Sequence, residues 1–217
     1  MRLYDCRKAA ERDSAIKAAV SAVRSGDLVV MPTDTVYGLG ADAFKSWSID
    51  ALLRTKKRGR DMAPPVLVGS RKALDGLTIS VPGNVKDLVA AFWPGPLTVI
   101  MPYSPTLTWD LGDTDGTVAV RMPLHPVALE VLRETGPMAV SSANKSGEPP
   151  ADTAADAKEQ LGYSVQVYLE AGPSPDKVPS TIVDCSQEVP RVLRAGALSV
   201  ERIRDVLPET LGPGDAG

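Results

Sequence analysis

Residues 32–40 read Pro-Thr-Asp-Thr-Val-Tyr-Gly-Leu-Gly and directly follow the apolar run Leu28-Val29-Val30-Met31. A short apolar run that ends in proline and then becomes hydroxyl-rich predicts a buried strand followed by a loop. Loops at the carboxyl ends of strands carry much of the ligand chemistry of α/β proteins. By itself the stretch fits a tight turn as well as a binding loop, so distant segments must decide between the two. Its candidate ligand contacts are Thr33, Asp34, Thr35, Tyr37, Gly38 and Gly40.

The composition is that of a globular protein, with 43% hydrophobic and 24% charged residues in 217. A net charge of −3 argues against general nucleic-acid binding, although it is compatible with a local basic patch. Two isolated cysteines and a single histidine argue against a Cys/His zinc site. Because the sequence shows neither a signal-peptide pattern nor a membrane-spanning apolar run, we expect a cytoplasmic protein without membrane contact.

Apolar periodicity predicts helices and strands that alternate without a regular βαβ repeat. Helices are expected over 9–25, from Ser48 as a cap, through 85–92, over 127–135, over 153–161 and after Ser199. Strands are expected at 2–6, 28–31, 65–68, 97–101, 118–121, 138–140, 165–170, 180–184 and 190–194. We therefore predict one α/β domain with a mixed sheet over residues 1–207. The Pro/Gly-rich residues 208–217 are expected to form a disordered tail.

The strongest electrostatic feature is a basic cluster made of Lys56, Lys57, Arg58 and Arg60. Arginine and lysine together suit phosphate, since one offers a planar fork of donors and the other a mobile point charge. A solvated helix end is the alternative, because cations complement the dipole at a helix C-terminus. The cluster does not match a P-loop, so a nucleotide site here would be of another kind.

Other polar residues follow predicted strands. Ser141, Ser142 and Asn144 come after an apolar strand, where they could contact a ligand or form a turn. Arg121 could clamp a carboxylate or cap surface carbonyls. No GxSxG elbow supports a serine nucleophile, and His125 fits a helix start better than a catalytic base. The recurrence of such groups at strand ends, which includes Ser180 and Arg194, favours one shared cleft.

Taken together, these segments resemble the YrdC-like family, whose characterised members are threonylcarbamoyl-AMP synthases. The matching segments occur in the family's order: PTDTVYGLG at 32–40, Lys56-Lys57-Arg58, FWPGPLT at 92–98, VAVRMPLHP at 118–126, SSANKSGEPP at 141–150, STIVD at 180–184 and VLRAGAL at 192–198. The resemblance implies a single twisted mixed-sheet α/β domain with a large concave cleft. It also implies an enzyme that joins L-threonine, bicarbonate and ATP into threonylcarbamoyl-AMP and pyrophosphate, for N6-threonylcarbamoyl modification of adenosine 37 in tRNA.

Carried over by position, the resemblance assigns three groups of residues. Those expected to bind ATP are Lys56, Arg58, Thr117, Ser142, Asn144 and Arg194, and of these Lys56, Arg58, Ser142 and Asn144 are expected to be catalytic. Those expected to bind threonine are Thr35, Arg121, Ser141 and Ser180, with Thr33, Tyr37 and Gly38 shaping the pocket. Mg²⁺ is expected to arrive with ATP, and neither a protein-bound metal nor a tightly bound cofactor is expected. Expected partners are a downstream threonylcarbamoyl transferase complex and tRNA or double-stranded RNA.

The chain departs from the family pattern at two positions. Leu67 stands where many members have a histidine, and Pro150 where some have a serine. The length corresponds to the short, single-domain form of the family. A non-catalytic member that binds double-stranded RNA or tRNA is the alternative function, and a carbamoyl-transfer module is a third. Asp34 and His125 receive no role from the sequence.

Overall fold

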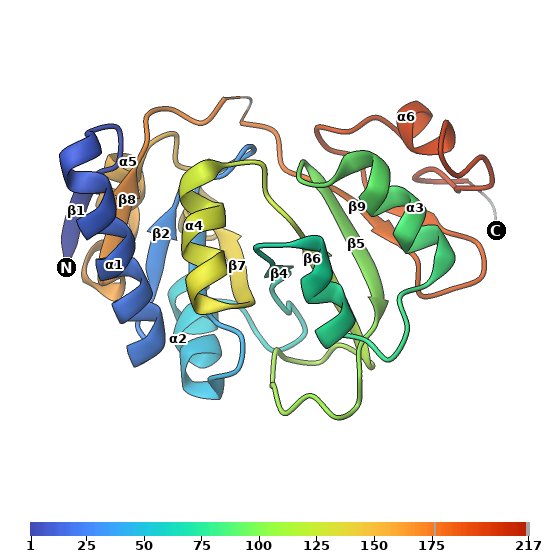
Figure 1. Ribbon diagram of the computed structural model, residues 1–217, viewed down its shortest axis with the longest axis horizontal. Coiled ribbons are helices and arrows are strands. Elements are labelled where there is room, and N and C mark those ends of the chain that lie inside the picture. Colours follow the sequence, from blue (N-terminus) through green and yellow to red (C-terminus); the bar gives the residue numbers. More distant parts are fainter. Residues whose placement is uncertain (176, 216–217) are drawn as a thin grey trace.

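The protein is described by a computed structural model that covers residues 1–175 and 177–215. Its centre is a ten-stranded sheet in which parallel and antiparallel pairs alternate irregularly, which confirms the predicted mixed sheet (Figure 1). In sheet order the strands are β1 (Arg2–Asp5), β8 (Val167–Glu170), β2 (Val29–Met31), β3 (Gly38–Asp42), β7 (Met138–Ser142), β4 (Val66–Leu67), β6 (Thr117–Arg121), β5 (Leu97–Pro102), β9 (Thr181–Asp184) and β10 (Arg191–Arg194).

The helices follow from caps and apolar periodicity. They are α1 (Ala9–Ser25), α2 (Ser46–Lys56), α3 (Gly83–Phe92), α4 (Pro126–Thr135), α5 (Ala154–Leu161) and α6 (Val200–Arg204), with 3₁₀ turns η1 (Arg71–Gly76) and η2 (Gly162–Ser164). Helix α1 ends at Gly26, whose φ of 90° is the left-handed conformation that favours glycine. Thr153 starts α5 with a reciprocal capping box, and Ser199 caps α6 as expected.

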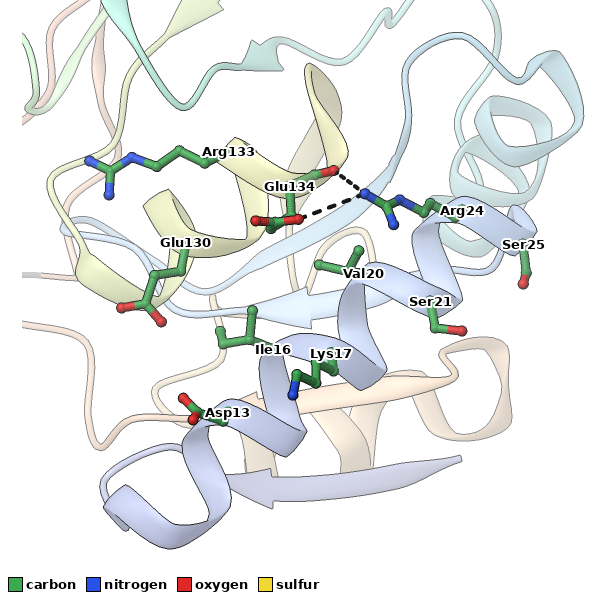
Figure 2. Close-up of a pocket in the computed structure, with 10 residues that line it drawn as sticks. All are labelled: Asp13, Ile16, Lys17, Val20, Ser21, Arg24, Ser25, Glu130, Arg133 and Glu134. Atoms are coloured by element: carbon green, nitrogen blue, oxygen red, sulfur yellow. Dashed lines mark hydrogen bonds and ion pairs between the residues drawn. The ribbon is translucent and has the colours of Figure 1, made fainter.

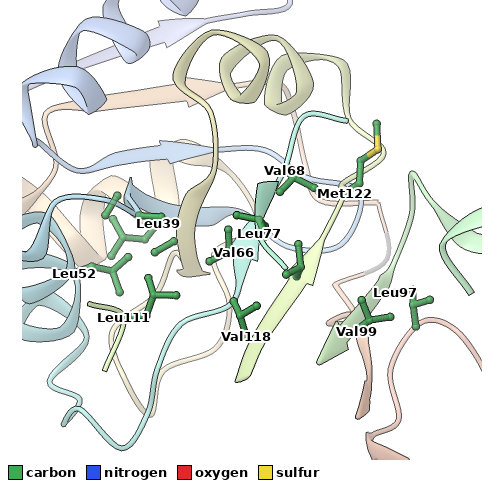
Figure 3. Packing of buried hydrophobic residues seen from close by; sticks show 14 of the residues in the cluster. Leu39, Leu52, Val66, Val68, Leu77, Leu97, Val99, Leu111, Val118 and Met122 are labelled. Atoms are coloured by element: carbon green, nitrogen blue, oxygen red, sulfur yellow. The ribbon is translucent and has the colours of Figure 1, made fainter. Parts of the chain in front are cut away.

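The core has two parts, one on each face of the sheet. Val29 and Met31 point toward α1 and α4, which lie side by side on one face, whereas Val30 points to the opposite face (Figure 1). This alternation is the period of two that a strand imposes. Figure 3 shows part of the other cluster, where Leu39 and Val66 of the sheet lie near Leu52 of α2. Because both faces are covered, the central strands are almost entirely apolar.

Residues 32–40 do not form one loop, as the sequence suggested. The loop ends at Tyr37, and Gly38 begins β3, which pairs antiparallel with both β2 and β7. A Cβ on Gly38 would lie 2.6 Å from Cγ1 of Val140, and one on Gly40 would lie 2.7 Å from Cε of Met138. At both positions the glycine leaves room for a side chain of the neighbouring strand β7, and the neighbour of Gly38, Val140, is the stiffer of the two.

Two further predictions need correction. Ser48 does not cap α2, which begins at Ser46; its hydroxyl donates instead to the carbonyl of Gly26, 2.8 Å away. Residues 208–215 differ from the expected disordered tail, because Thr210 is buried and the backbone of Leu211 pairs with β10. The apolar contacts of Leu207 anchor this segment, and the rest of the predicted tail, 216–217, lies outside the described residues.

Candidate functional site

A cavity of about 300 Å³ opens where several strands end. Ten of the thirteen residues predicted for the site line it: Thr33, Thr35, Tyr37, Gly38, Arg58, Arg121, Ser141, Ser142, Ser180 and Arg194. The strand register explains part of this convergence, since Gly38 pairs with Ser142 and Leu39 with Ser141 across β3 and β7. The first predicted motif therefore lies directly beside the S-x-N motif, about 100 residues later in the sequence.

Arg121 is the best-anchored cation of the cavity. Its Nε donates to the carbonyl of Gly95 at 3.0 Å, and Nη1 donates to Oγ1 of Thr35 at 2.8 Å. Its Nη2 forms an ion pair with Oδ1 of Asp34 at 2.5 Å. Burial lowers the pKa of Arg121 and the Asp34 carboxylate opposes this, so the guanidinium stays charged at neutral pH. The residue is thus a fixed positive charge in the cavity wall.

The threonine pair of the opening loop is locked internally. Oγ1 of Thr33 donates to the carbonyl of Val36 at 2.7 Å and accepts from the backbone N–H of Thr35 at 3.1 Å. Thr35 in turn accepts from Arg121, so its hydroxyl proton is free to reach a ligand or the Thr33 oxygen 3.1 Å away. These bonds hold the loop in one conformation and point a hydroxyl at the cavity.

Ser180 and Arg194 form another part of the cavity wall. Nε and Nη2 of Arg194 both donate to the carbonyl of Ser180, at 3.0 and 2.8 Å, and Nη2 also lies 3.1 Å from its hydroxyl. The Ser180 hydroxyl is 2.8 Å from that of Thr98 on β5, a cavity residue that the sequence analysis missed. A buried threonine inside the apolar run Leu97–Met101 was the available signal.

The cavity carries an excess of positive charge. Arg58, Arg121 and Arg194 all line it, and Nη1 of Arg58 donates to the Ser141 hydroxyl at 3.2 Å. Among the residues that the structure describes, Asp34 is the one carboxylate that pairs with any of these three arginines. Such an arrangement attracts anions and stabilises developing negative charge. The same wall also contains Val36, Leu67 and Val140, which give it an apolar side.

Lys56 and Asn144 lie immediately behind the cavity and do not line it. The Lys56 side chain is fully buried, and its ammonium donates to the Ser142 carbonyl at 2.7 Å and to Oδ1 of Asn144 at 2.9 Å. It also donates to the carbonyl of Asn144. The lysine thus fixes the backbone that presents Ser142, and its predicted contact with ATP stays a prediction.

Lys56 should make stability depend on pH. Burial, with a smaller contribution from the Arg58 charge, lowers the pKa of Lys56 from 10.5 to about 8. Between these two values the unfolded chain holds a proton that the folded chain has lost, so rising pH favours folding. Relative to Lys56→Met, the wild type should gain roughly 3 kcal/mol of unfolding free energy between pH 8 and pH 10.5. Urea unfolding of both proteins across this pH range tests the prediction, because the contributions of the other titrating groups cancel between them. A difference in unfolding free energy that does not change with pH would contradict it.

Thr117, expected to bind ATP, lines a separate cavity of about 280 Å³. Arg58 and Pro65 line the first cavity, while the intervening Asp61 and Pro64 line this second one. The two cavities are therefore neighbours along one segment of chain. The assignment of Thr117 to ATP stays a prediction.

Tyr37 joins the cavity to the buried carboxylate of Glu170. The tyrosine hydroxyl donates to the carbonyl of Gly172 at 2.6 Å and lies 3.2 Å from Oε1 of Glu170. Burial raises the pKa of Tyr37, so it stays a neutral phenol. The carboxylate also accepts from the backbone N–H of Ala154 at 3.0 Å, in the first turn of α5. Tyr37 thus lines the cavity while its hydroxyl is held by a segment that the sequence did not link to it.

A further cavity of about 640 Å³ lies between α1 and α4 (Figure 2). Its floor includes Ile16 and Val20, and charges of both signs surround it. The dashed lines in Figure 2 join the guanidinium of Arg24 to Glu134. Nη2 of Arg24 donates to the backbone carbonyl of Glu134 at 2.7 Å. No residue predicted for the site lines this cavity.

The described residues contain neither a metal-binding cluster nor a membrane-spanning helix. Within residues 1–175 and 177–215, no group of three or more His, Cys, Asp or Glu side chains could hold a metal ion. Over the same residues, no helix combines the length and apolar character needed to cross a membrane.

Comparison with known proteins settles the family. The family model for Sua5, YciO and YrdC proteins, described as telomere recombination, matches residues 21–196. The chain belongs to this family. The resemblance drawn from the sequence motifs is thereby confirmed, and so is the YrdC-like fold.

Several relatives cover most of this chain. A Mycobacterium tuberculosis protein, provisionally named threonylcarbamoyl-AMP synthase, is 56% identical over 94% of this chain and 94% of its own length. The threonylcarbamoyl-AMP synthase of Bacillus subtilis is 36% identical over 90% of this chain, which spans 57% of that relative. Among solved structures, Pyrococcus abyssi Sua5 complexed with L-threonine superposes with a TM-score of 0.91 at 31% identity, covering 100% of this chain and 65% of that one.

Proposed function

We propose that this protein is an L-threonylcarbamoyladenylate synthase. The observation that carries the proposal is the convergence of distant residues on one cavity. All four residues expected to bind threonine line it, beside three of those expected to bind ATP. The names of the Mycobacterium and Bacillus relatives and the threonine-bound Sua5 structure support the same conclusion.

The reaction joins two anions, which explains the cationic wall. The threonine amine and bicarbonate form a carbamate and water; a carbamate oxygen then attacks the α-phosphorus of ATP. The new P–O bond replaces the one to pyrophosphate, which leaves with its electron pair. Arg121 binds the threonine carboxylate, while Arg58 offsets the charge that develops on the phosphates. Thr35, Ser141 and Ser180 supply hydroxyls that orient the amino acid.

Mg²⁺ enters as part of the metal–nucleotide substrate, where it offsets the charge of the phosphates. The phosphates lie at Arg58 and Ser142, and the nucleoside extends toward the second cavity, which Thr117 lines. Threonylcarbamoyl-AMP is the activated donor for N6-threonylcarbamoyl modification of adenosine 37. Its consumer is a threonylcarbamoyl transferase that acts on tRNA.

The proposal is tested by incubating the purified protein with ATP, Mg²⁺, bicarbonate and radiolabelled L-threonine. Labelled threonylcarbamoyl-AMP and an equal amount of pyrophosphate are expected, and both should disappear when bicarbonate is omitted. If no product forms while the protein still binds tRNA, the synthase proposal fails and the non-catalytic RNA-binding alternative replaces it.

Replacing Arg58 with alanine should lower kcat by roughly 100-fold, the typical loss for one donor to a developing anion. The side chain is only partly buried and makes one hydroxyl contact, to Ser141, so the fold should be preserved. Pyrophosphate release under saturating substrates measures kcat. Arg54→Ala, an exposed arginine on the preceding helix α2, is the matched control and should leave kcat unchanged. Equal rates for wild type and Arg58→Ala would remove Arg58 from the phosphate site.

A further inference from the structure

The guanidinium of Arg121 depends on neighbours outside its own strand for its orientation. Arg121 is the last residue of β6, and its three bonded nitrogens reach Gly95 and two residues of the opening loop. Asp34 is the only charged member of this set, and it is separated from Arg121 by 87 positions in sequence. Asp34 itself is absent from the cavity lining, so any effect it has on a ligand must pass through Arg121.

The hydrogen bonds of Arg121 show which of its N–H donors remain available to a ligand. A guanidinium has five N–H donors. Nε, Nη1 and Nη2 of Arg121 each use one of them, on Gly95, Thr35 and Asp34. One N–H on each terminal nitrogen has no partner within the described part of the chain. A pair of donors on the two terminal nitrogens is what a carboxylate accepts from arginine in a bidentate contact.

Asp34 also fixes the chain that follows β6. Its Oδ1 atom, which accepts from Nη2 of Arg121 at 2.5 Å, accepts from the backbone N–H of Leu124 at 2.9 Å. One carboxylate oxygen therefore ties the opening loop to both Arg121 and the segment that leads into α4. The contact is mostly shielded from water, since the Arg121 and Asp34 side chains are 7% and 13% exposed.

We propose that Asp34 is a positioning residue for the synthase reaction: it holds the Arg121 guanidinium so that its two remaining N–H groups face the carboxylate of L-threonine. The inference rests on the proposed function, and it assigns a role to a residue that contacts no substrate. This role explains why Arg121, the most buried arginine of an anion-binding cavity, forms an ion pair with the carboxylate of Asp34.

The negative charge of Asp34 and its role in positioning Arg121 predict opposite effects of an Asp34 substitution on threonine binding. If its charge alone mattered, neutralising it would strengthen the pull of Arg121 on an anion and threonine would bind more tightly. If position matters, a shape-conserving neutral residue should suffice, whereas a displaced carboxylate should not. Misplacing a binding group by about 1 Å can cost as much as 100-fold.

The test measures binding of L-threonine by isothermal titration calorimetry, together with KM for threonine and for ATP. Asp34→Asn keeps the accepting oxygen and should bind threonine within about threefold of wild type, whereas Asp34→Ala should bind about 10- to 100-fold more weakly. Asp34→Glu keeps the charge but shifts it by one methylene, and should weaken binding by about fivefold or more. KM for ATP should change less than about twofold in all three, because no contact of Asp34 reaches the ATP residues.

Two controls separate positioning from general damage. Glu130→Gln removes the carboxylate of another arginine ion pair with the same 2.5 Å separation, which joins Glu130 of α4 to Arg12 of α1. Neither residue lines the candidate cavity, so threonine binding should be unchanged. In an Arg121→Ala background, adding Asp34→Ala should weaken threonine binding less than about twofold further, because the residue it positions is gone.

The outcomes that overturn the inference are distinct from those that overturn the function. Threonine binding at or above wild-type strength in Asp34→Ala or Asp34→Glu refutes positioning, and so do additive losses with Arg121→Ala. If Asp34→Ala does not fold, the comparison of Asp34→Glu with Asp34→Asn decides, and positioning fails unless Asn is the better binder. If the wild type makes no product but binds threonine, only the proposed reaction fails. If it binds no threonine, both fail.

Discussion

Replacing Lys56 with methionine should destabilise the protein by roughly 2–6 kcal/mol and lower turnover more than any change to the cavity wall. The buried ammonium serves three oxygens, on the Ser142 carbonyl and on the carbonyl and side chain of Asn144. A buried acceptor that loses its hydrogen-bond partner costs about 1–3 kcal/mol, and two acceptors of Asn144 depend on this donor, which gives the expected range.

Methionine has a similar length but donates nothing, so the carbonyl and side-chain oxygens of Asn144 would lose their donor, and the Ser142 carbonyl would keep only the backbone N–H of Asn144. The segment that carries Ser142 would then move, which links the loss of stability to a loss of activity. Urea unfolding and the threonylcarbamoyl-AMP assay measure the two effects. Lys57→Met is the matched control, since Lys57 is the next residue, is exposed and lies at the end of α2. A Lys56→Met protein as stable and active as this control would contradict the assigned role.

Gly196→Ala should prevent stable folding of the Ser180 wall and abolish measurable threonine binding. A Cβ at this position would lie 2.6 Å from the carbonyl carbon of Ser180 and 2.7 Å from its oxygen. The Cβ would also meet the carbonyl oxygen of Pro179, and all three atoms are backbone atoms that cannot rotate away as a side chain could. Arg194 already holds the Ser180 carbonyl oxygen with two donors. Overpacking that a core cannot relieve typically costs about 1–3 kcal/mol, and more where backbone must shift.

The control for this substitution is Gly83→Ala, at the start of α3. An added methyl group there would meet no neighbouring atom within 4 Å, and alanine favours helix, so stability should be equal or slightly higher. Thermal unfolding and threonine calorimetry compare the two variants. Normal threonine affinity in Gly196→Ala would show that the Ser180 backbone tolerates displacement.

The sequence predicted most elements because burial imposes its own periodicity. Helix 9–25 matches α1, and the strand expected at 180–184 differs from β9 by one residue. The sequence predicted a loop over all of 32–40 because glycine is a typical loop residue. In the structure Gly38 and Gly40 belong to β3 and make room for Val140 and Met138 of a neighbouring strand. Which strand lies alongside is a long-range property that local patterns do not contain.

For the site, the sequence by itself determined the residue types and their order: hydroxyls and arginines placed where strands end. Strand pairing then brought ten of the thirteen predicted residues to one cavity. Only the tertiary structure decided what each side chain touches. It turned Lys56 inward to the carbonyls of Ser142 and Asn144, set Thr117 in a second cavity, and paired Asp34 with Arg121. The physical reason is that side-chain direction follows from strand register and from the partners that buried polar groups must find, and both are set by residues far away in sequence.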